Sequence, residues 1–316
     1  MNGKVSVDAI EKLHKTTAAE LGIPVSEIDF LLAELRTLLT GISMLREVTP
    51  RSRDYLVSFG ERLSVRLMAS YLNTLNVRAE FKDAWDIGFI SDSQYTGADL
   101  LPETWENIRK NLTPYAEGKK GDGMPMPIVT GFIAKDAKGF ITTLGRGGSD
   151  LTATLIGAAL MAEEVQTWKD VDGILTTDPR IVKEARTVPV ATYDEVAELA
   201  YFGAQVLHPR SMQPCLQTGT PVRVKNSYNI EAPGSIIVTS HETKPVPVRA
   251  ITSKKNVTLI DIVSTRMLGQ YGFLAKVFES FASHSISVDV VATSEVSVSL
   301  PDVYARVFFK IMAEAG

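Results

Sequence analysis

The stretch TTLGRGGSDLTATLIGAAL, residues 142–160, decides the expected fold of this chain. Its first residues predict a strand, its glycines predict a tight turn, and its apolar end predicts a helix. Three glycines, Gly145, Gly147 and Gly148, would let the backbone come close to a ligand, because glycine has no side chain. Backbone N–H groups at the start of a helix attract negative charge, so the stretch predicts an anion-binding turn.

Two charged side chains belong to this turn. Arg146 can hold a carboxylate or a phosphate through two hydrogen bonds, and Asp150 could hold an ammonium group or, through water, a metal ion. The glycine spacing matches neither the dinucleotide-binding fingerprint nor the Walker lysine loop. The alternative is a structural strand-to-helix turn with Asp150 as an ordinary N-cap, which the position of Arg146 inside the turn disfavours.

The residues before the turn predict helices followed by short strands. Apolar residues recur at helical spacing between Leu31 and Ile42, and Thr49 with Pro50 offers an N-cap and a first-turn proline for a second long helix. The further expected elements are strands at 77–85, 86–92, 127–134 and 140–144, with a helix at 101–112. We therefore expect a helical pair that leads into an α/β domain.

The residues after the turn continue this alternation. Residues 165–178 predict a hairpin, because Asp172 and Gly173 suit a tight turn. Thr192 and Glu195 predict a capping box for a helix from 192 to 207. Beyond a boundary at residues 244–247, a strand, a helix and a second strand predict a compact β-α-β module. Alternating elements of this kind indicate a layered α/β sheet followed by a second, smaller domain.

Composition excludes several classes of protein. The formal net charge of the 316 residues is -4, so we expect neither a nucleic acid nor an anionic membrane as partner. The single cysteine, Cys215, excludes an internal disulfide framework, and the four histidines are too far apart in sequence to indicate a zinc site. We expect no transmembrane helix and no secretory signal.

Several motifs, in order, resemble those of the aspartate kinase family. They are SFGERLS (58–64), VTGFIA (129–134), GRGGSD (145–150), WKDVDGILTTDPR (168–180) and YFGAQVLHPRSM (201–212). The resemblance implies an amino-acid kinase (carbamate kinase-like) fold over residues 1–245. It also implies phosphorylation of the side-chain carboxylate of L-aspartate by ATP with Mg²⁺, the first step of lysine, threonine and methionine biosynthesis.

The same resemblance assigns roles to individual residues. It implies that Glu61 receives the substrate's amino group, that Phe132 lies beside the aspartate pocket, and that Arg146 and Ser149 bind the substrate carboxylates. Asp150 would lie near the reacting phosphates. The residues implied for the ATP pocket are Lys169, Asp170, Leu175 and Arg180. No residue is assigned as a metal ligand, and His208 before Pro209 is interpreted as structural.

Residues 246–316 resemble part of an ACT domain, a small ferredoxin-like fold that binds amino acids. The resemblance implies a homodimer through these domains and an effector pocket for lysine, or for S-adenosylmethionine as in plant enzymes. The implied pocket residues are Met267, Gln270, Phe273, Leu274, Val288, Asp289, Ser294 and Glu295. Without the resemblance, the apolar residues of 273–278 would simply form the buried face of a helix.

The sequence departs from the family pattern at both ends. Relatives open with a strand and a KFGG segment that contacts ATP phosphates, and no such segment precedes the helices here. The final residues, PDVYARVFFKIMAEAG, do not resemble the family's second ACT repeat. The wording of the motifs most resembles plant enzymes, which are chloroplast proteins. Two alternatives stay open: another amino-acid kinase, such as a glutamate or acetylglutamate kinase, and a catalytically silent amino-acid sensor.

Overall fold

The computed structural model describes most of the chain. The described residues are 7–117, 124–201, 207–241, 248–254, 258–263, 271–284, 286, 288, 292–293, 297–303 and 308–311. The chain forms two compact units. The first unit comprises residues 1–174, 189–197 and 206–241, and the second comprises residues 175–188, 198–205 and 242–316.

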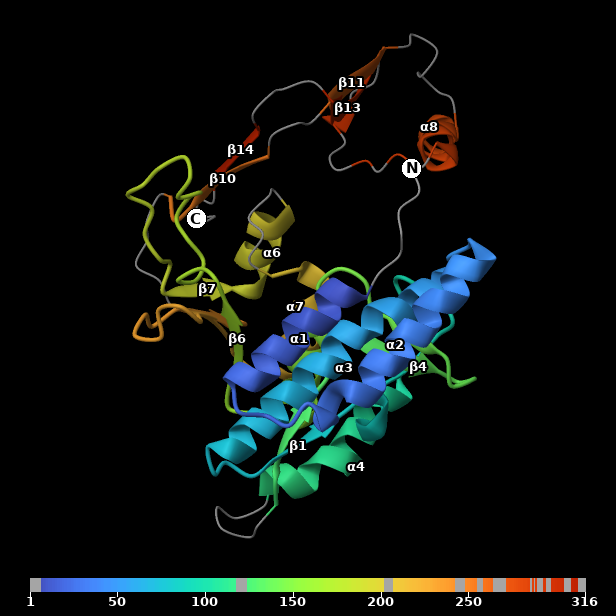
Figure 1. Cartoon of the computed structure of the whole chain (residues 1–316). Coiled ribbons are helices and arrows are strands. Elements are labelled where there is room, and N and C mark those ends of the chain that lie inside the picture. Colours follow the sequence, from blue (N-terminus) through green and yellow to red (C-terminus); the bar gives the residue numbers. More distant parts are fainter. Residues whose placement is uncertain are drawn as a thin grey trace. The chain divides into compact units, whose positions relative to one another are not determined.

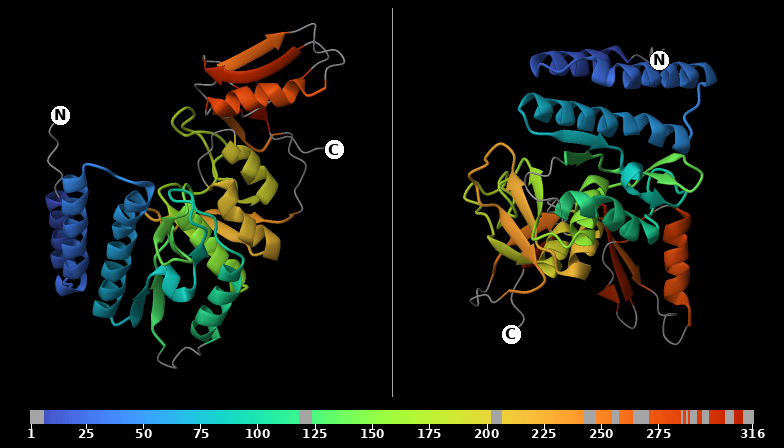
Figure 2. Two further views of the ribbon diagram at one scale, coloured as in Figure 1. Left: turned by 90° about the vertical axis from the view of Figure 1, so that its right-hand side faces the viewer. Right: turned by 90° about the horizontal axis from the view of Figure 1, so that it is seen from below.

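Three helices open the first unit and lie side by side (Figures 1 and 2). They are α1 (Asp8–Glu20), α2 (Ser26–Leu45) and α3 (Pro50–Thr74). The predicted cap of α3 is confirmed, because the Thr49 side chain accepts a hydrogen bond from the Ser52 amide and Pro50 occupies the first turn. The apolar face predicted for α2 is buried against α3, and together they form one core with members Ile28, Leu31, Leu32, Leu35, Phe59, Leu63 and Leu67.

The strands of the first unit form three sheets. They are β1 (Ala79–Lys82), β2 (Ile90–Ser91), β3 (Met126–Val129), β4 (Ile133–Asp136), β5 (Ile141–Thr143), β6 (Val165–Lys169), β7 (Val190–Thr192), β8 (Val222–Asn226) and β9 (Ser235–Val238). β1 pairs with β3, β4 lies between β2 and β5, and the third sheet has the order β6-β8-β9-β7. The pairs β1–β3, β2–β4, β6–β8 and β7–β9 are parallel, as alternating strands and helices favour.

Helices cover these sheets and connect the strands. They are η1 (Ala84–Ile87), α4 (Glu103–Glu117), α5 (Gly148–Ala159), α6 (Tyr193–Tyr201) and α7 (Pro209–Thr218). A second core joins α4, α5 and the hairpin β4–β5; its members include Ile108, Leu112, Ala134, Leu144, Leu151 and Leu155. The capping box predicted for α6 is confirmed, because Thr192 and Glu195 exchange hydrogen bonds between side chain and backbone.

The second unit contains short antiparallel strands and one helix. They are β10 (Ile251–Lys254), β11 (Thr258–Val263), α8 (Phe273–Ser283), β12 (Ala292–Thr293), β13 (Ser297–Val303) and β14 (Phe308–Ile311). β10 pairs with β14, and β13 lies between β11 and β12. The buried face expected for α8 is not found, since Leu274 is 40% exposed and Phe278 is 39% exposed.

Two predicted elements differ from the structure. Residues 127–134 form no single strand, because Phe132 adopts a left-handed backbone conformation (φ 67°) that ends β3 and begins β4 in another sheet. Residues 165–178 form no hairpin, because β6 pairs in parallel with the distant β8 and Gly173 (φ 123°) lies outside any strand. In the first case, β3 and β4 pair with strands of two different sheets. In the second case, the pairing of β6 with the distant β8 outweighs the preference of Asp172 and Gly173 for a tight turn.

Within the ranges given above, no helix is long and apolar enough to cross a membrane. The same residues contain no group of three or more His, Cys, Asp or Glu side chains that could hold a metal ion.

A buried ion pair fixes α3 to the segment between β1 and η1. Arg66 is 5% exposed and Asp83 is 6% exposed, and their side chains form two hydrogen bonds of 3.2 and 3.3 Å. Among the described residues, the Nε atoms of Arg62 and Arg66 are buried without a hydrogen-bond partner. The site therefore has more buried donors than acceptors: Asp83 lies within ion-pair distance of both Arg66 (3.2 Å) and Arg62 (3.7 Å), and Glu34 lies 3.5 Å from Arg62.

We predict that Asp83→Ala destabilises the first unit by about 3 kcal/mol, because it leaves a buried guanidinium without its partner. Urea unfolding followed by circular dichroism would measure this. The control is Lys15→Ala, which breaks a more exposed ion pair with Glu11 on α1 and should cost much less stability. Equal effects of the two substitutions would contradict the role given to Asp83.

Candidate active site

The predicted strand, turn and helix are confirmed as β5, residues 144–147 and α5. Gly145 (φ 71°) and Gly147 (φ 74°) both adopt the left-handed conformation that side chains disfavour. A Cβ atom on Gly147 would lie 2.6 Å from the Cβ atom of His208. The chain can therefore make this turn only with glycine at position 147.

The start of α5 is open to a ligand. Its N-cap is Gly147, and no side chain caps the helix. The first-turn N–H groups thus keep the partial positive charge that favours an anion. Arg146 is exposed beside them and forms no hydrogen bond or ion pair within the described part of the chain. This is the arrangement that the sequence predicted for binding a carboxylate or a phosphate.

Arg210, at the start of α7, holds the turn from one side. Its guanidinium donates hydrogen bonds to the carbonyl oxygens of Leu144 (3.1 Å) and Ala98 (2.9 Å), and it contacts the carboxylate of Asp99 (2.5 Å). The sequence analysis assigned no role to Arg210. Arg210 directly follows Pro209, and proline is common in the first turn of a helix, which was the one available signal.

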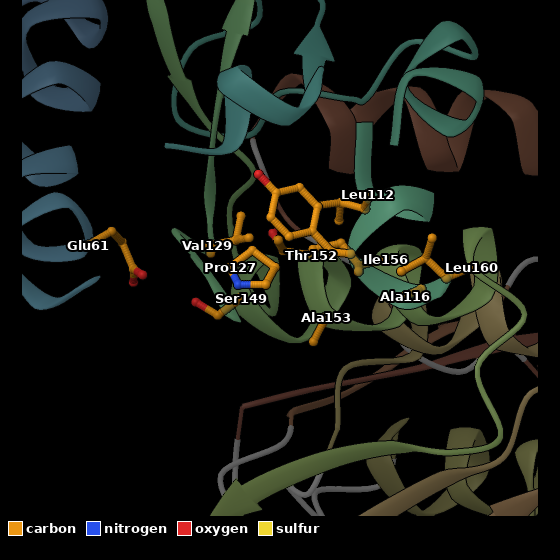
Figure 3. A pocket seen from close by; sticks show the side chains of 12 residues that line it. Glu61, Leu112, Ala116, Pro127, Val129, Ser149, Thr152, Ala153, Ile156 and Leu160 are labelled. Carbon is orange, nitrogen blue, oxygen red and sulfur yellow. The ribbon is translucent and has the colours of Figure 1, made fainter. Parts of the chain in front are cut away.

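A cavity of about 520 Å³ lies beside the turn and has one polar and one apolar end (Figure 3). Glu61 on α3, Gly131 and Ser149 on α5 line the polar end, and the apolar side chains that line the rest include Leu112, Val129, Ile156 and Leu160. Gly131 is required there, because a Cβ atom at this position would lie 3.1 Å from the Cα atom of Ser149. The structure therefore brings together two of the predicted substrate residues, Glu61 and Ser149.

The carboxylate of Glu61 occupies a poorly solvated position. Burial raises its pKa above the ordinary value of 4.5, and a hydrogen bond from the Gly131 backbone opposes this rise in part. A carboxylate that has lost water and has one hydrogen-bond donor gains much from a cation. The polar end of the cavity is thus suited to an ammonium group.

Phe132 lies against the turn and does not line the cavity. Its amide donates a hydrogen bond to the hydroxyl of Thr152 on α5 (3.2 Å), and its carbonyl accepts one from the amide of Leu144 (2.8 Å). Its left-handed backbone is therefore held by both elements that flank the turn. Strain of this kind persists only where neighbouring contacts enforce it.

Asp150 and Lys169 form an ion pair, although the sequence analysis gave them separate roles. The Nζ atom of Lys169, at the end of β6, lies 3.0 and 3.2 Å from the two carboxylate oxygens of Asp150 in the first turn of α5. The pair places a cation and an anion next to the uncapped helix start. Either side chain could instead form an ion pair with a charged ligand there.

The other residues predicted for the ATP pocket are Asp170, Leu175 and Arg180. Asp170 is exposed after β6. Leu175 and Arg180 belong to the second unit. The guanidinium of Arg180 binds Asp178 through two hydrogen bonds of 3.0 Å.

The predicted effector residues fall largely outside the described residues. Met267, Gln270, Asp289, Ser294 and Glu295 are not described. Phe273 is half-buried and Leu274 exposed on α8, and Val288 is half-buried. His208, interpreted as structural, is confirmed as such, because its side chain caps α7 by accepting a hydrogen bond from the Arg210 amide (3.2 Å).

The residues at the apolar end of the cavity were also not predicted from the sequence. Its residues from α4 and α5, such as Leu112 and Ile156, resemble ordinary core positions in the sequence. Helical spacing predicts which face is apolar and does not distinguish a core from a cavity wall. No sequence signal identified them.

Comparisons with known proteins show the family of the chain. The amino acid kinase family model matches residues 7–226. Aspartokinase 1, chloroplastic, of Arabidopsis thaliana is 56% identical over 92% of this chain, and the chain spans about half (51%) of that relative. The crystal structure of E. coli aspartokinase III in complex with aspartate and ADP has a TM-score of 0.78 at 32% identity, covering 96% of this chain and 72% of that one. The lysine and aspartate complex of the same enzyme has a TM-score of 0.73 at 35% identity, covering 90% of this chain and 66% of that one.

These matches confirm the resemblance that the motifs indicated. The family model covers more than half of the 316 residues, and the chain therefore belongs to the amino acid kinase family, as a member of its aspartokinase branch.

Proposed function

We propose that this chain phosphorylates the side-chain carboxylate of L-aspartate with ATP. The observation that carries the proposal is the single cavity lined by Glu61 and Ser149, beside a helix start that no side chain caps. One end of this site suits an ammonium group, and the other suits anions. Aspartate has both kinds of group within one small molecule.

The reaction needs placement of its substrates more than acid or base catalysis. The aspartate carboxylate is already ionised at neutral pH, so its oxygen can attack the γ-phosphorus directly. The bond from that phosphorus to the β-phosphate oxygen breaks, which gives aspartyl phosphate and ADP. Glu61 would hold the ammonium group, and Ser149 with Arg146 would hold the carboxylates.

The phosphates would lie near the start of α5. Its free N–H groups and the Nζ atom of Lys169 provide positive charge there. Asp170, Leu175 and Arg180 are the other residues that the family motifs assign to ATP, and Arg180 would exchange Asp178 for phosphate. Mg²⁺ would be held mainly by the phosphates and would neutralise their charge, and Asp150 could contact it through water.

We also propose a regulatory role for residues 246–316 and a catalytic role for residues 1–245. Support comes from the E. coli relative, whose structure was solved with lysine. The proposal includes an ACT fold, lysine or S-adenosylmethionine as effector, and a homodimer through these domains. The Arabidopsis relatives are named chloroplastic, which supports the same compartment for this chain.

A catalytically silent amino-acid-binding protein is the second candidate. Two predicted phosphate-binding cations are neutralised by neighbours, Lys169 by Asp150 and Arg180 by Asp178. Both candidates bind aspartate, and only the kinase turns it over. Incubation with ATP, Mg²⁺, aspartate and hydroxylamine, which converts an acyl phosphate into a hydroxamate, separates them. Binding without hydroxamate or ADP would favour the silent protein.

We predict that Arg146→Ala lowers kcat/KM for aspartate by about a hundredfold, because it removes a charge-assisted, two-bond contact. Its thermal unfolding should not change, since Arg146 is exposed. The matched control is Arg109→Ala, which removes an equally exposed guanidinium from α4 and should leave kcat/KM unchanged. Near-normal turnover by the Arg146 variant would contradict the proposed role.

We predict opposite effects of Glu61→Gln on stability and on aspartate binding. Because burial raises the folded-state pKa of Glu61, its ionisation costs stability as pH rises from about 4.5 through that raised pKa. The neutral variant should therefore unfold at a higher temperature at pH 7, yet bind aspartate more weakly.

Calorimetric titration between pH 5 and pH 8 tests the same residue. The affinity of the wild-type chain should fall as pH falls through the pKa of Glu61, because the protonated acid cannot pair with an ammonium group. The affinity of Glu61→Gln should be low and independent of pH. Glu163→Gln, at an exposed position, is the control and should behave as wild type. If the affinity of Glu61→Gln for aspartate also depended on pH, the titrating group would be a residue other than Glu61.

A further inference from the structure

Asp54 is a buried carboxylate on α3 that lies outside the motifs discussed above. It is 1% exposed, and its Oδ2 atom accepts hydrogen bonds from the amides of Thr96 (2.8 Å) and Thr143 (2.9 Å). Its Oδ1 atom accepts a third from the Thr143 hydroxyl (2.9 Å). Within the described ranges it forms no ion pair. Three charge-assisted hydrogen bonds thus hold a buried charge in one position.

The partners of Asp54 flank the glycine turn. Thr143 is the last residue of β5, two positions before Gly145. Thr96 adopts a left-handed backbone (φ 73°), and a Cβ atom on Gly145 would lie 3.4 Å from its carbonyl oxygen. The amide of Ala98 also donates to the Thr143 carbonyl (2.8 Å). One carboxylate therefore joins both segments against which the turn is packed.

The same helix carries Glu61 on the same face. Glu61 follows Asp54 by seven residues, which is nearly two turns and about 10 Å along the helix axis. Its carboxylate reaches the backbone of Gly131 in the cavity wall. α3 thus touches the site at two points, with Asp54 at the turn and Glu61 at the polar end of the cavity.

We propose that Asp54 is a positioning residue, which sets the spacing between the Glu61 carboxylate and the Arg146 turn. This inference rests on the proposed function, since it assumes one ligand held at both points. A ligand with an ammonium group and a carboxylate a few bonds apart binds well only if the two sites keep a fixed separation. Asp54 supplies this constraint through β5 and does not touch the ligand.

The arrangement separates this role from general stability. Arg210 holds Leu144 and Ala98 from α7, independently of α3. Without the Asp54 carboxylate, the turn remains fastened to α7 and loses its connection to the helix that carries Glu61. We expect a folded protein in which the Glu61 carboxylate and the Arg146 turn no longer keep a fixed separation.

The experiment compares Asp54→Asn with Asp136→Asn. Asp136 is 4% exposed and accepts hydrogen bonds from the amides of Lys138 and Phe140 and the hydroxyls of Ser93 and Tyr95, at the opposite end of the β4–β5 hairpin. It is therefore a matched buried carboxylate that binds neither Thr96 nor Thr143 within the described ranges. At a temperature where both variants are folded, Asp54→Asn should raise the calorimetric Kd for L-aspartate at least about tenfold, and Asp136→Asn should leave it unchanged.

A milder variant tests the same contact even if Asp54→Asn does not fold. Thr143→Val removes one of the three hydrogen bonds and keeps the shape of the side chain. It should weaken aspartate binding by a smaller factor, and it should have no added effect in the Asp54→Asn background, because the two groups act through one contact.

Hydrogen exchange of the segment 143–148 gives a second, ligand-free readout. Exchange there should accelerate in Asp54→Asn and not in Asp136→Asn. Equal changes in Kd for the two Asn variants, or unchanged exchange in Asp54→Asn, would overturn the positioning role. If wild-type chain bound no aspartate while exchange changed as expected, the proposed function would be wrong and the connection between Asp54 and the turn would stand.

Discussion

The uncapped start of α5 is the constraint on which the site depends. A helix normally satisfies its first N–H groups with a side chain or water, and here Gly147 occupies the cap position without any side chain to do so. His208 lies so close that only glycine fits. The start of α5 therefore lacks the hydrogen bond that a capping side chain would provide, and a bound anion would supply it. The contacts of Arg210, Phe132 and Asp54 all serve to keep this turn in place.

Charge is distributed around the turn so that each group can be exchanged for a ligand. Asp150 and Lys169 neutralise each other at the helix start, and burial raises the pKa of Glu61 above its ordinary value. These interactions are weaker than those that a ligand of complementary charge would form. The buried pair Arg66–Asp83 is different, because it lies away from the cavity and fixes α3 to the sheet region. The buried ion pair that fixes α3 and the charged groups beside the cavity are therefore separate.

Elements with local signals could be predicted from the sequence. The turn at 144–147, the Thr49 cap and the Thr192–Glu195 capping box each depend on residues within a few positions, and all are confirmed. The division of 127–134 into two strands and the parallel pairing of β6 with β8 could not be predicted, because distant partners decide them.

The same distinction applies to the site. Glu61 and Ser149 were found through motifs, and the structure places both on one cavity. Arg210 and Asp54 were missed, because their partners lie 66 and 89 positions away in sequence. The ion pair of Lys169 with Asp150 was also not foreseen, since it depends on the end of β6 meeting the start of α5.

The central claim is that Glu61 at the polar end of the cavity recognises an ammonium group, while Ser149 in the cavity wall and Arg146 in the neighbouring glycine turn recognise carboxylates. Calorimetric binding of L-aspartate, succinate and L-asparagine to the same preparation tests it most directly. Succinate lacks the ammonium group and asparagine lacks the second carboxylate, so the account predicts that both bind far more weakly than aspartate. Equal affinities for the three compounds, or no binding of aspartate, would contradict it.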